Sequence, residues 1–200
     1  MINKENSTQK LAGTAVLVAI IIILQVAFGA IQIGPFTITL TMVPIIIGAI
    51  LYGPSTGALL GAVFGVVVCI QVVTGAAGAG STMMLELNPV ATILVCLIKG
   101  TAAGLAAGLV YQAVGKKNTW IGILLAAIVS PVCNTGIFTI ALVTIFRTLA
   151  EEWALGAQAS SVAAYILAGI IGVNFVIELL LDLVISPLIL RILKALKASH

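Results

Sequence analysis

The chain has 200 residues, of which 62% are apolar and 8% charged, with a formal net charge of +3. Soluble domains carry about 25% charged residues, and disordered segments need low hydrophobicity, so this composition excludes both classes. It predicts an integral membrane protein, because 200 residues at about 20 per span hold six or seven helices with their loops. No phosphate-binding G-x-x-x-x-G-K-[ST] loop occurs, so any ATP-driven work would need a partner chain.

Six apolar stretches follow one another along the chain, separated by segments rich in Gly and Pro. They span residues 11–28, 39–52, 55–73, 89–114, 120–146 and 162–190. Each run is continuous rather than alternating, which favours transmembrane helices over a β-barrel. The sequence therefore predicts an all-α membrane protein with six transmembrane helices in one domain, residues 1–200. Its predicted parts are a cytoplasmic N-terminal segment (1–10), a six-helix bundle (11–190) and a basic cytoplasmic tail (191–200).

Basic residues set the predicted orientation, because positive charge accumulates on the cytoplasmic side of a membrane protein. They lie before the first span, between the fourth and fifth, and after the sixth: Lys4, Lys10, Lys116, Lys117, Arg191, Lys194 and Lys197. An even number of spans places all of them on one side, with both termini in the cytoplasm. The opposite loops carry Arg147 together with Glu86, Glu151 and Glu152.

Small residues recur at helical spacing on three of the predicted spans. The third and fourth spans carry glycine at every fourth position: Gly57, Gly61 and Gly65, then Gly100, Gly104 and Gly108. Such faces let helix backbones approach closely in lipid, so we expect these repeats to pack inside the bundle. On the first span, Ala12, Ala15 and Ala19 form another stripe, which could pack internally or face another protein.

Polar side chains at membrane depth are costly, so they mark function by default. Those inside the predicted spans or at their ends are Gln25, Gln71, Asn88, Lys99, Asn134, Thr135, Asn174, Glu178 and Asp182. The predicted orientation places Lys99, Asn134, Asn174 and Glu178 at similar depth, near the middle of the membrane.

Two interpretations of these polar residues stay open. In the first, Lys99 pairs with Glu178 or Asp182, and the asparagines form hydrogen bonds between helices. In the second, the cluster lines a small-molecule pocket open to the outside. The predicted binding residues are then Gln71, Asn88, Lys99, Asn134, Asn174 and Glu178, and Asp182 has a structural role.

The histidine and cysteine content of the chain makes an enzyme an unfavourable interpretation. His200 is the lone histidine, and the three cysteines lie in separate spans without metal-ligand spacing, so we expect no catalytic residue, metal or cofactor. We expect no nucleic-acid partner either. A stand-alone ion-coupled transporter or proton carrier is one alternative, because Lys99, Glu178 and Asp182 could relay protons. A membrane subunit that captures a ligand fits better, since no inverted repeat with matching broken helices is detectable.

Two stretches carry a family resemblance: IGPFTITLTMVPIIIGAILYGPSTGALLGAVFG at residues 33–65 and LIKGTAAGLAAG at residues 97–108. They resemble the second to fourth spans of the substrate-binding (S) components of energy-coupling factor (ECF) vitamin transporters. The similarity extends over most of the chain, including its length, the six helices and the cytoplasmic termini. The fold that it implies is the S-component bundle.

The resemblance implies a mechanism of import. Such components bind a vitamin in the outer half and dock on a transmembrane coupling subunit, which carries two cytoplasmic ATPases and sits in the bacterial plasma membrane. Ala15 and Ala19 match the docking signature of the family. The loop at residues 29–36, with Gln32 and Gly34, resembles its gate. The loop at residues 75–85, with Gly78, would close with the gate.

The same resemblance narrows the choice among candidate ligands. Thiamine binders use several tryptophans in the pocket, whereas Trp120 and Trp153 lie at predicted interfaces. Riboflavin binders share the asparagine at Asn174 but tend to have a lysine at the position of Ile177. Lys99 with several amides suits a small carboxylate with hydroxyl and amide groups, and pantothenate fits that description. Riboflavin or another vitamin is the alternative, and a neutral ligand would fit if Glu178 neutralised Lys99.

Overall fold

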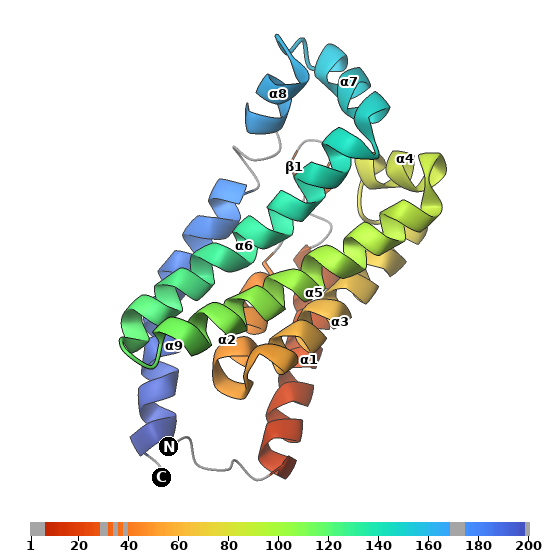
Figure 1. Ribbon diagram of the computed structural model, residues 1–200. Helices are drawn as coiled ribbons and strands as arrows, with labels where there is room; N and C mark the ends of the chain where they lie inside the picture. The colour runs from red at the N-terminus through yellow and green to blue at the C-terminus, as the bar shows by residue number, and fades with distance from the viewer. Residues whose placement is uncertain (1–6, 29–31, 34–35, 38–39, 169–174, 199–200) are drawn as a thin grey trace.

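The computed structural model describes residues 7–28, 32–33, 36–37, 40–168 and 175–198. Its helices are α1 (Ser7–Phe28), α2 (Met42–Tyr52), α3 (Pro54–Val73), α4 (Ala79–Leu87), α5 (Pro89–Val114), α6 (Thr119–Thr144), α7 (Arg147–Gly156), α8 (Val162–Tyr165) and α9 (Val176–Ala198). Strands β1 (Gln32–Ile33) and β2 (Phe36–Thr37) pair as a short antiparallel hairpin. Figure 1 shows a bundle in which α3 packs on α5, α5 on α6, and α6 on α9.

The long helices match the predicted spans. Among the described residues, α1, α3, α5 and α6 are long and apolar enough to cross a membrane. The predicted span 39–52 corresponds to α2, a shorter apolar helix. The predicted span 162–190 corresponds to α8 and the N-terminal part of α9, with residues 169–174 outside the described ones. These are the helices of a multi-pass membrane protein, whereas the count of six spans and the cytoplasmic termini stay predictions.

The predicted glycine-rich loop at residues 75–85 is correct only at its start, because α4 begins at Ala79. Gly75 and Gly78 have φ of 77° and 92°, a backbone conformation that glycine adopts without steric cost. After this turn, Met84 is buried against the end of the bundle and holds the short helix in place. Burial of the Met84 side chain thus outweighs the glycine content that predicted a loop.

The predicted charged loop after the fifth span is also wrong, because most of it forms α7. Arg147 Nε lies 2.8 Å from Glu151 Oε1, one helical turn away on the exposed face. On the other face, Leu149 and Ala150 are buried in a cluster with Phe146. An amphipathic helix therefore forms where the charges alone predicted an irregular segment.

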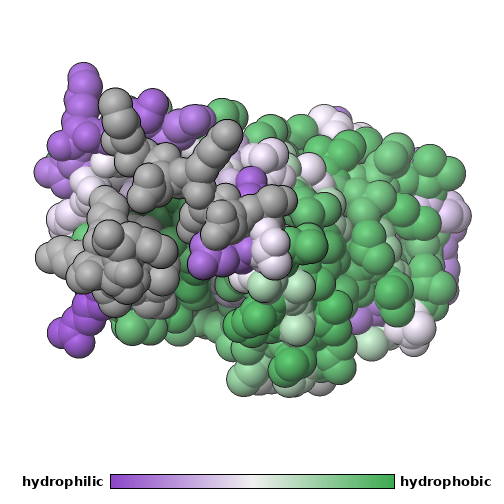
Figure 2. Space-filling view, turned by 90° about the horizontal axis from the view of Figure 1, so that it is seen from below, coloured by the Kyte–Doolittle hydropathy of each residue, from purple (hydrophilic) through white to green (hydrophobic). Residues whose placement is uncertain are grey.

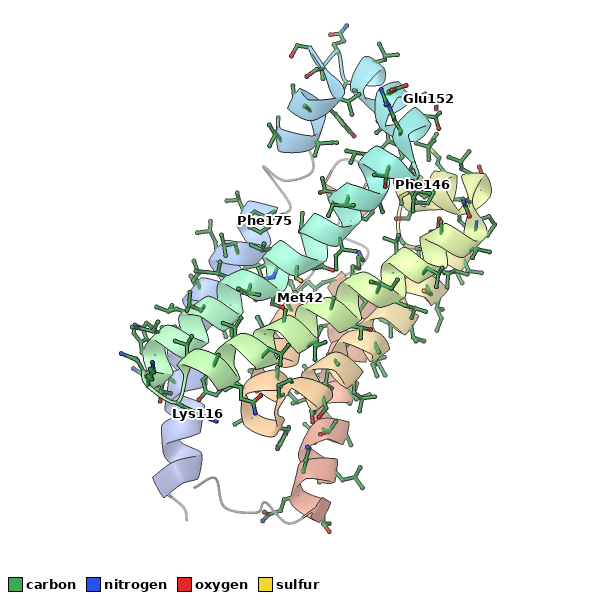
Figure 3. All side chains as sticks on the ribbon, viewed as in Figure 1. Met42, Lys116, Phe146, Glu152 and Phe175 are labelled. Atoms are coloured by element: carbon green, nitrogen blue, oxygen red, sulfur yellow. The ribbon has the colours of Figure 1, made fainter. Side chains whose placement is uncertain are left out.

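The two ends of the bundle differ in charge. Figure 1 shows the start of α1, the turn between α5 and α6, and the end of α9 at one end, with α4, α7 and α8 at the other. Lys116 and Glu152 lie at these opposite ends in Figure 3. Between the ends, the outward side chains of the long helices are largely apolar, and Figure 2 shows apolar residues over much of the visible surface. This is the surface that a helical bundle presents to lipid, with the basic residues gathered at one end.

Glycines bring the backbones of α3 and α5 into direct contact. A Cβ added to Gly61 would collide with the carbonyl group of Gly100, and one added to Gly104 would collide with that of Gly57. Close approach of this kind supplies van der Waals packing in lipid, where the hydrophobic effect does not drive helices together. The predicted internal packing of the glycine repeats is therefore confirmed. We call this contact the α3–α5 seam.

Helix α2 is buried between the longer helices. Ile45, Ile46 and Ala49 are at most 1% exposed, and they pack in a core with Leu60 of α3 and Ile123 of α6. A helix that is apolar on most of its circumference is stable when it is surrounded, which explains why this short element carries so many buried residues.

The α3–α5 seam predicts the effect of adding a single methyl group. Gly61→Ala should lower the free energy of unfolding by about 1–3 kcal/mol, because the two backbones must separate to admit the methyl group. The measurement is the thermal unfolding midpoint of the purified protein in detergent.

Gly136→Ala is the matched control, because a Cβ at this helical position meets no atom within 4 Å. It should leave stability unchanged or raise it by about 0.4–1 kcal/mol. Equal loss of stability in both variants would mean that the seam does not limit packing.

Candidate functional site

The ammonium group of Lys99 lies between two phenylalanine rings. On α5, Lys99 Nζ is 5.9 Å from the ring centroid of Phe64 on α3 and 5.3 Å from that of Phe138 on α6. The α3–α5 seam sets this geometry, because a Cβ at Gly100 would meet Phe64 Cδ1 at 2.8 Å. Aromatic faces attract a cation by about 0.5–2 kcal/mol each without neutralising it. The half-buried ammonium group is therefore flanked by two aromatic faces.

Two buried carboxyl groups lie on α9 near this lysine. Glu178 and Asp182 are 4% and 2% exposed, and their spacing of one turn puts them on the same helix face. Lys99 and Asp182 are the charged groups within electrostatic range of Glu178. Among the described residues, Arg147 and Glu151 form the only ion pair with a nitrogen–oxygen distance under 4.0 Å, so Lys99 forms none with Glu178 or Asp182. The predicted ion pair of Lys99 with either carboxylate is therefore wrong for these residues, because the rings hold the ammonium group instead.

Several buried oxygens near the middle of the bundle have no hydrogen-bond partner among the described residues. They are Asn134 Oδ1, Thr139 Oγ1, Glu178 Oε1 and Asp182 Oδ2. A buried polar atom without a partner costs about 1–3 kcal/mol, so folded proteins rarely leave several of them together. Each of these oxygens is available to accept a hydrogen bond from an N–H or O–H group.

Asn134 shares a face of α6 with the ring of Phe138, four residues further along. One turn before it, Ser130 Oγ lies 3.6 Å from Met42 Sδ, and Figure 3 shows Met42 in the middle of the bundle. Asn134 therefore lies near mid-bundle, within about one turn of the ring that contacts Lys99. Lys99 and Asn134 therefore lie at similar depth, whereas the predicted convergence of Glu178 with them stays a prediction.

Gln71 has a different environment. Its Oε1 accepts a hydrogen bond of 2.8 Å from Gln25 Nε2, and its own Nε2 donates one of 3.0 Å to the Gln25 carbonyl oxygen. Thr41 Oγ1 donates a further bond of 3.2 Å to Gln25 Oε1. Gln71 therefore fastens α3 to α1, while Gln25 links α1 to the start of α2. These bonds favour an anchoring role for Gln71 over direct contact with a ligand.

Asn88 lies apart from the central cluster. It is the N-cap of α5, where its Oδ1 accepts a hydrogen bond of 3.1 Å from the backbone N–H of Ala91. The side chain is exposed, and eleven residues of helix separate it from Lys99, about 16 Å along the axis. The structure thus accounts for Asn88 as a helix cap at the end of the bundle.

The remaining predicted residues fall into three groups. Asn174 and Gly34 lie outside the described residues, and Gln32 belongs to β1. Gly78 forms the turn before α4. Ala15 and Ala19 are exposed on α1, whereas Leu17 on another face of this helix is buried in the core. Ala15 and Ala19 therefore face away from the described part of the bundle, and docking on another protein stays a prediction.

The rings of Phe64 and Phe138 were not predicted as part of the site. Apolar aromatics on separate spans carry no signal that they flank a lysine, because that arrangement depends on the register of three helices. The described pocket between α7 and α8 is no alternative site: it is lined by alanines and Tyr165, with no charged side chain to orient a solute. Nor do three His, Cys, Asp or Glu side chains gather anywhere in the described ranges, as a metal site would need.

Comparison with known proteins adds one finding. A family model described as "ECF transporter, substrate-specific component" matches residues 9–190, nearly the whole chain. No curated protein is similar enough to match it.

The linked amides of Gln25 and Gln71 predict an energetic coupling between α1 and α3. Each replacement by leucine leaves a buried partner unsatisfied and should lower the free energy of unfolding by about 1–3 kcal/mol. The double variant should lose less than the sum of the two by about 1 kcal/mol, measured on the ligand-free protein in a double-mutant cycle. Additive losses would show that the two side chains do not interact.

Proposed function

The chain belongs to the substrate-specific components of ECF transporters, and on that premise we propose that it captures a small water-soluble vitamin from outside the cell for import. Members of this family are transport proteins rather than enzymes. We place the binding site at Lys99, Asn134 and Glu178, with Asn174 joining them from the segment before α9. Gln71 and Asn88 support this site from the outer half by fixing α3 and α5.

The observation that carries the proposal is the unpaired cation between two rings. An ammonium group held by Phe64 and Phe138, and by no carboxylate among the described residues, can bind the carboxylate of a ligand. The unpartnered oxygens of Asn134 and Glu178 can accept hydrogen bonds from its amide and hydroxyl groups. Pantothenate combines these groups, so it is our preferred ligand, and riboflavin is the alternative.

Uptake requires partners, because the chain has no ATP-binding loop. We propose that it works with a transmembrane coupling subunit and two cytoplasmic ATPase subunits in a bacterial plasma membrane. The exposed positions of Ala15 and Ala19 support docking through α1, because small side chains let a second helix approach closely. The proposed gate residues are Gln32 in β1 and Gly78 just before α4, and Figure 1 shows β1 and α4 away from the turn between α5 and α6.

Binding by the isolated chain is the first test. Titration calorimetry of the purified protein with pantothenate, without ATP or metal, should give saturable binding. Lys99→Met should weaken it more than tenfold, above about 1.4 kcal/mol, because the ligand carboxylate loses its cation. Lys116→Met, at the exposed turn between α5 and α6, is the matched control and should bind as the original chain does.

A panel of other water-soluble vitamins, including riboflavin, belongs to the same experiment. Binding of another vitamin would keep the transport function and change the ligand. Binding of none, together with ion-coupled accumulation by the chain alone in lipid vesicles, would establish the stand-alone carrier instead.

Docking is tested separately from capture. Ala15→Leu with Ala19→Leu should abolish vitamin uptake by cells that contain the coupling subunit and ATPases, and should leave calorimetric binding intact. Ala27→Leu is the control, because this exposed alanine on the same helix lies about 80° around the axis from Ala19. Loss of binding with intact assembly of the complex would contradict a docking role for these two alanines.

A further inference from the structure

Two cysteines from separate helices meet at the α3–α5 seam. Cys69 lies one turn after Gly65 on α3, and a Cβ added to Gly65 would lie 2.7 Å from the backbone oxygen of Cys96 on α5. The Cys69 thiol donates a weak hydrogen bond of 3.7 Å to the backbone oxygen of Ile93, which is one turn before Cys96. Each cysteine thus lies beside the turn that precedes the other one along the chain.

The direction of the two helices brings the thiols together. Gly57 faces Gly104 and Gly65 faces Cys96, so α3 and α5 run antiparallel. Helical side chains lean toward the N-terminus of their own helix, so the side chains of Cys69 and Cys96 lean toward each other. The two thiols are close enough to interact directly, and both cysteines are free. Spacing along the sequence gave no sign of this pair, because the register of two helices creates it.

A pair of thiols suits one class of metal ion. The described ranges lack a cluster of three His, Cys, Asp or Glu side chains. Cu(I) needs no third ligand, because it is a soft cation that thiolates select and that two of them hold in a linear arrangement. We propose that Cys69 and Cys96 bind one cuprous ion as a two-thiolate site that bridges α3 and α5. This inference does not depend on the proposed vitamin.

The charge of such a complex can be balanced within the protein. On binding, two Cu–S bonds form and the S–H bond of each thiol breaks, with both protons passing to water. One Cu(I) with two thiolates carries one negative charge, which an apolar interior tolerates only beside a cation. Lys99 follows Cys96 by three residues and so lies next to it on the surface of α5. Among the described residues no carboxylate is paired with Lys99, and its single positive charge equals that of the complex in size.

The test uses the full chain, purified with its cysteines reduced, and cuprous ion supplied as the coloured bicinchoninate complex. The chain should remove one copper ion per molecule, which is measured as loss of the colour. X-ray absorption at the copper edge should then show two sulfur neighbours. Three or more sulfur neighbours, or nitrogen and oxygen in their place, would overturn the two-thiolate site, and so would a chain that removes no copper.

Serine variants assign the ion to the seam. Cys69→Ser and Cys96→Ser should each lose the copper, because one thiolate alone does not hold it against bicinchoninate. Cys133→Ser is the matched control, since Cys133 lies on α6, and it should bind one ion as the original chain does. Copper kept by both seam variants, or lost from the Cys133 variant, would overturn the assignment. The count of sulfur neighbours in the original chain decides the question even where a variant fails to fold.

The bridge between the helices has its own readout. A ligand that binds the folded chain more tightly than the unfolded chain raises the unfolding midpoint, and a cross-link between two helices acts in the same direction. One equivalent of cuprous ion should therefore raise the midpoint of the original chain and of Cys133→Ser, and leave that of Cys69→Ser unchanged. An equal rise in all three would indicate adventitious binding and would overturn the bridge.

Discussion

Direct contact between the backbones of α3 and α5 is the constraint on which the site depends. Gly61 and Gly100 leave no room for a side chain between the two helices, so the register of one against the other is fixed. Lys99 directly precedes Gly100, and Phe64 lies next to it because of that register. The glycines that encode tight packing therefore also set the position of the Lys99 ammonium group within the bundle.

The polar residues at membrane depth divide into two kinds once their partners are known. Gln25 and Gln71 satisfy one another between helices, and Asn88 satisfies the first turn of α5. Asn134 and Glu178 have oxygens without partners among the described residues, although both are almost fully buried. In an apolar surrounding this difference is large in energy, because no bulk water substitutes for a missing partner. The presence or absence of a hydrogen-bond partner thus separates polar residues that stabilise the fold from polar residues with an oxygen still available for a hydrogen bond.

Much of the fold could be predicted from the sequence, because a membrane span is encoded by length and hydropathy alone. The predicted span 89–114 has the bounds of α5. Loops 75–85 and 147–153 were not predicted as helices, because their helical form depends on apolar faces that pack on the end of the bundle. For the site, the sequence indicated Lys99 at mid-depth. It could not indicate that two aromatic rings, rather than a carboxylate, surround the ammonium group, since that depends on tertiary geometry.

The helices that carry the site are not equally bound to one another. Phe64, Lys99 and Phe138 belong to α3, α5 and α6, which form a continuous layer. Glu178 belongs to α9, which packs mainly on α6 and α2. Tightly interlocked backbones resist sliding, so separation of the helices is easiest at the boundary with α9. Entry of a solute between Lys99 and Glu178 would then displace α9 while the layer of α3, α5 and α6 keeps its register.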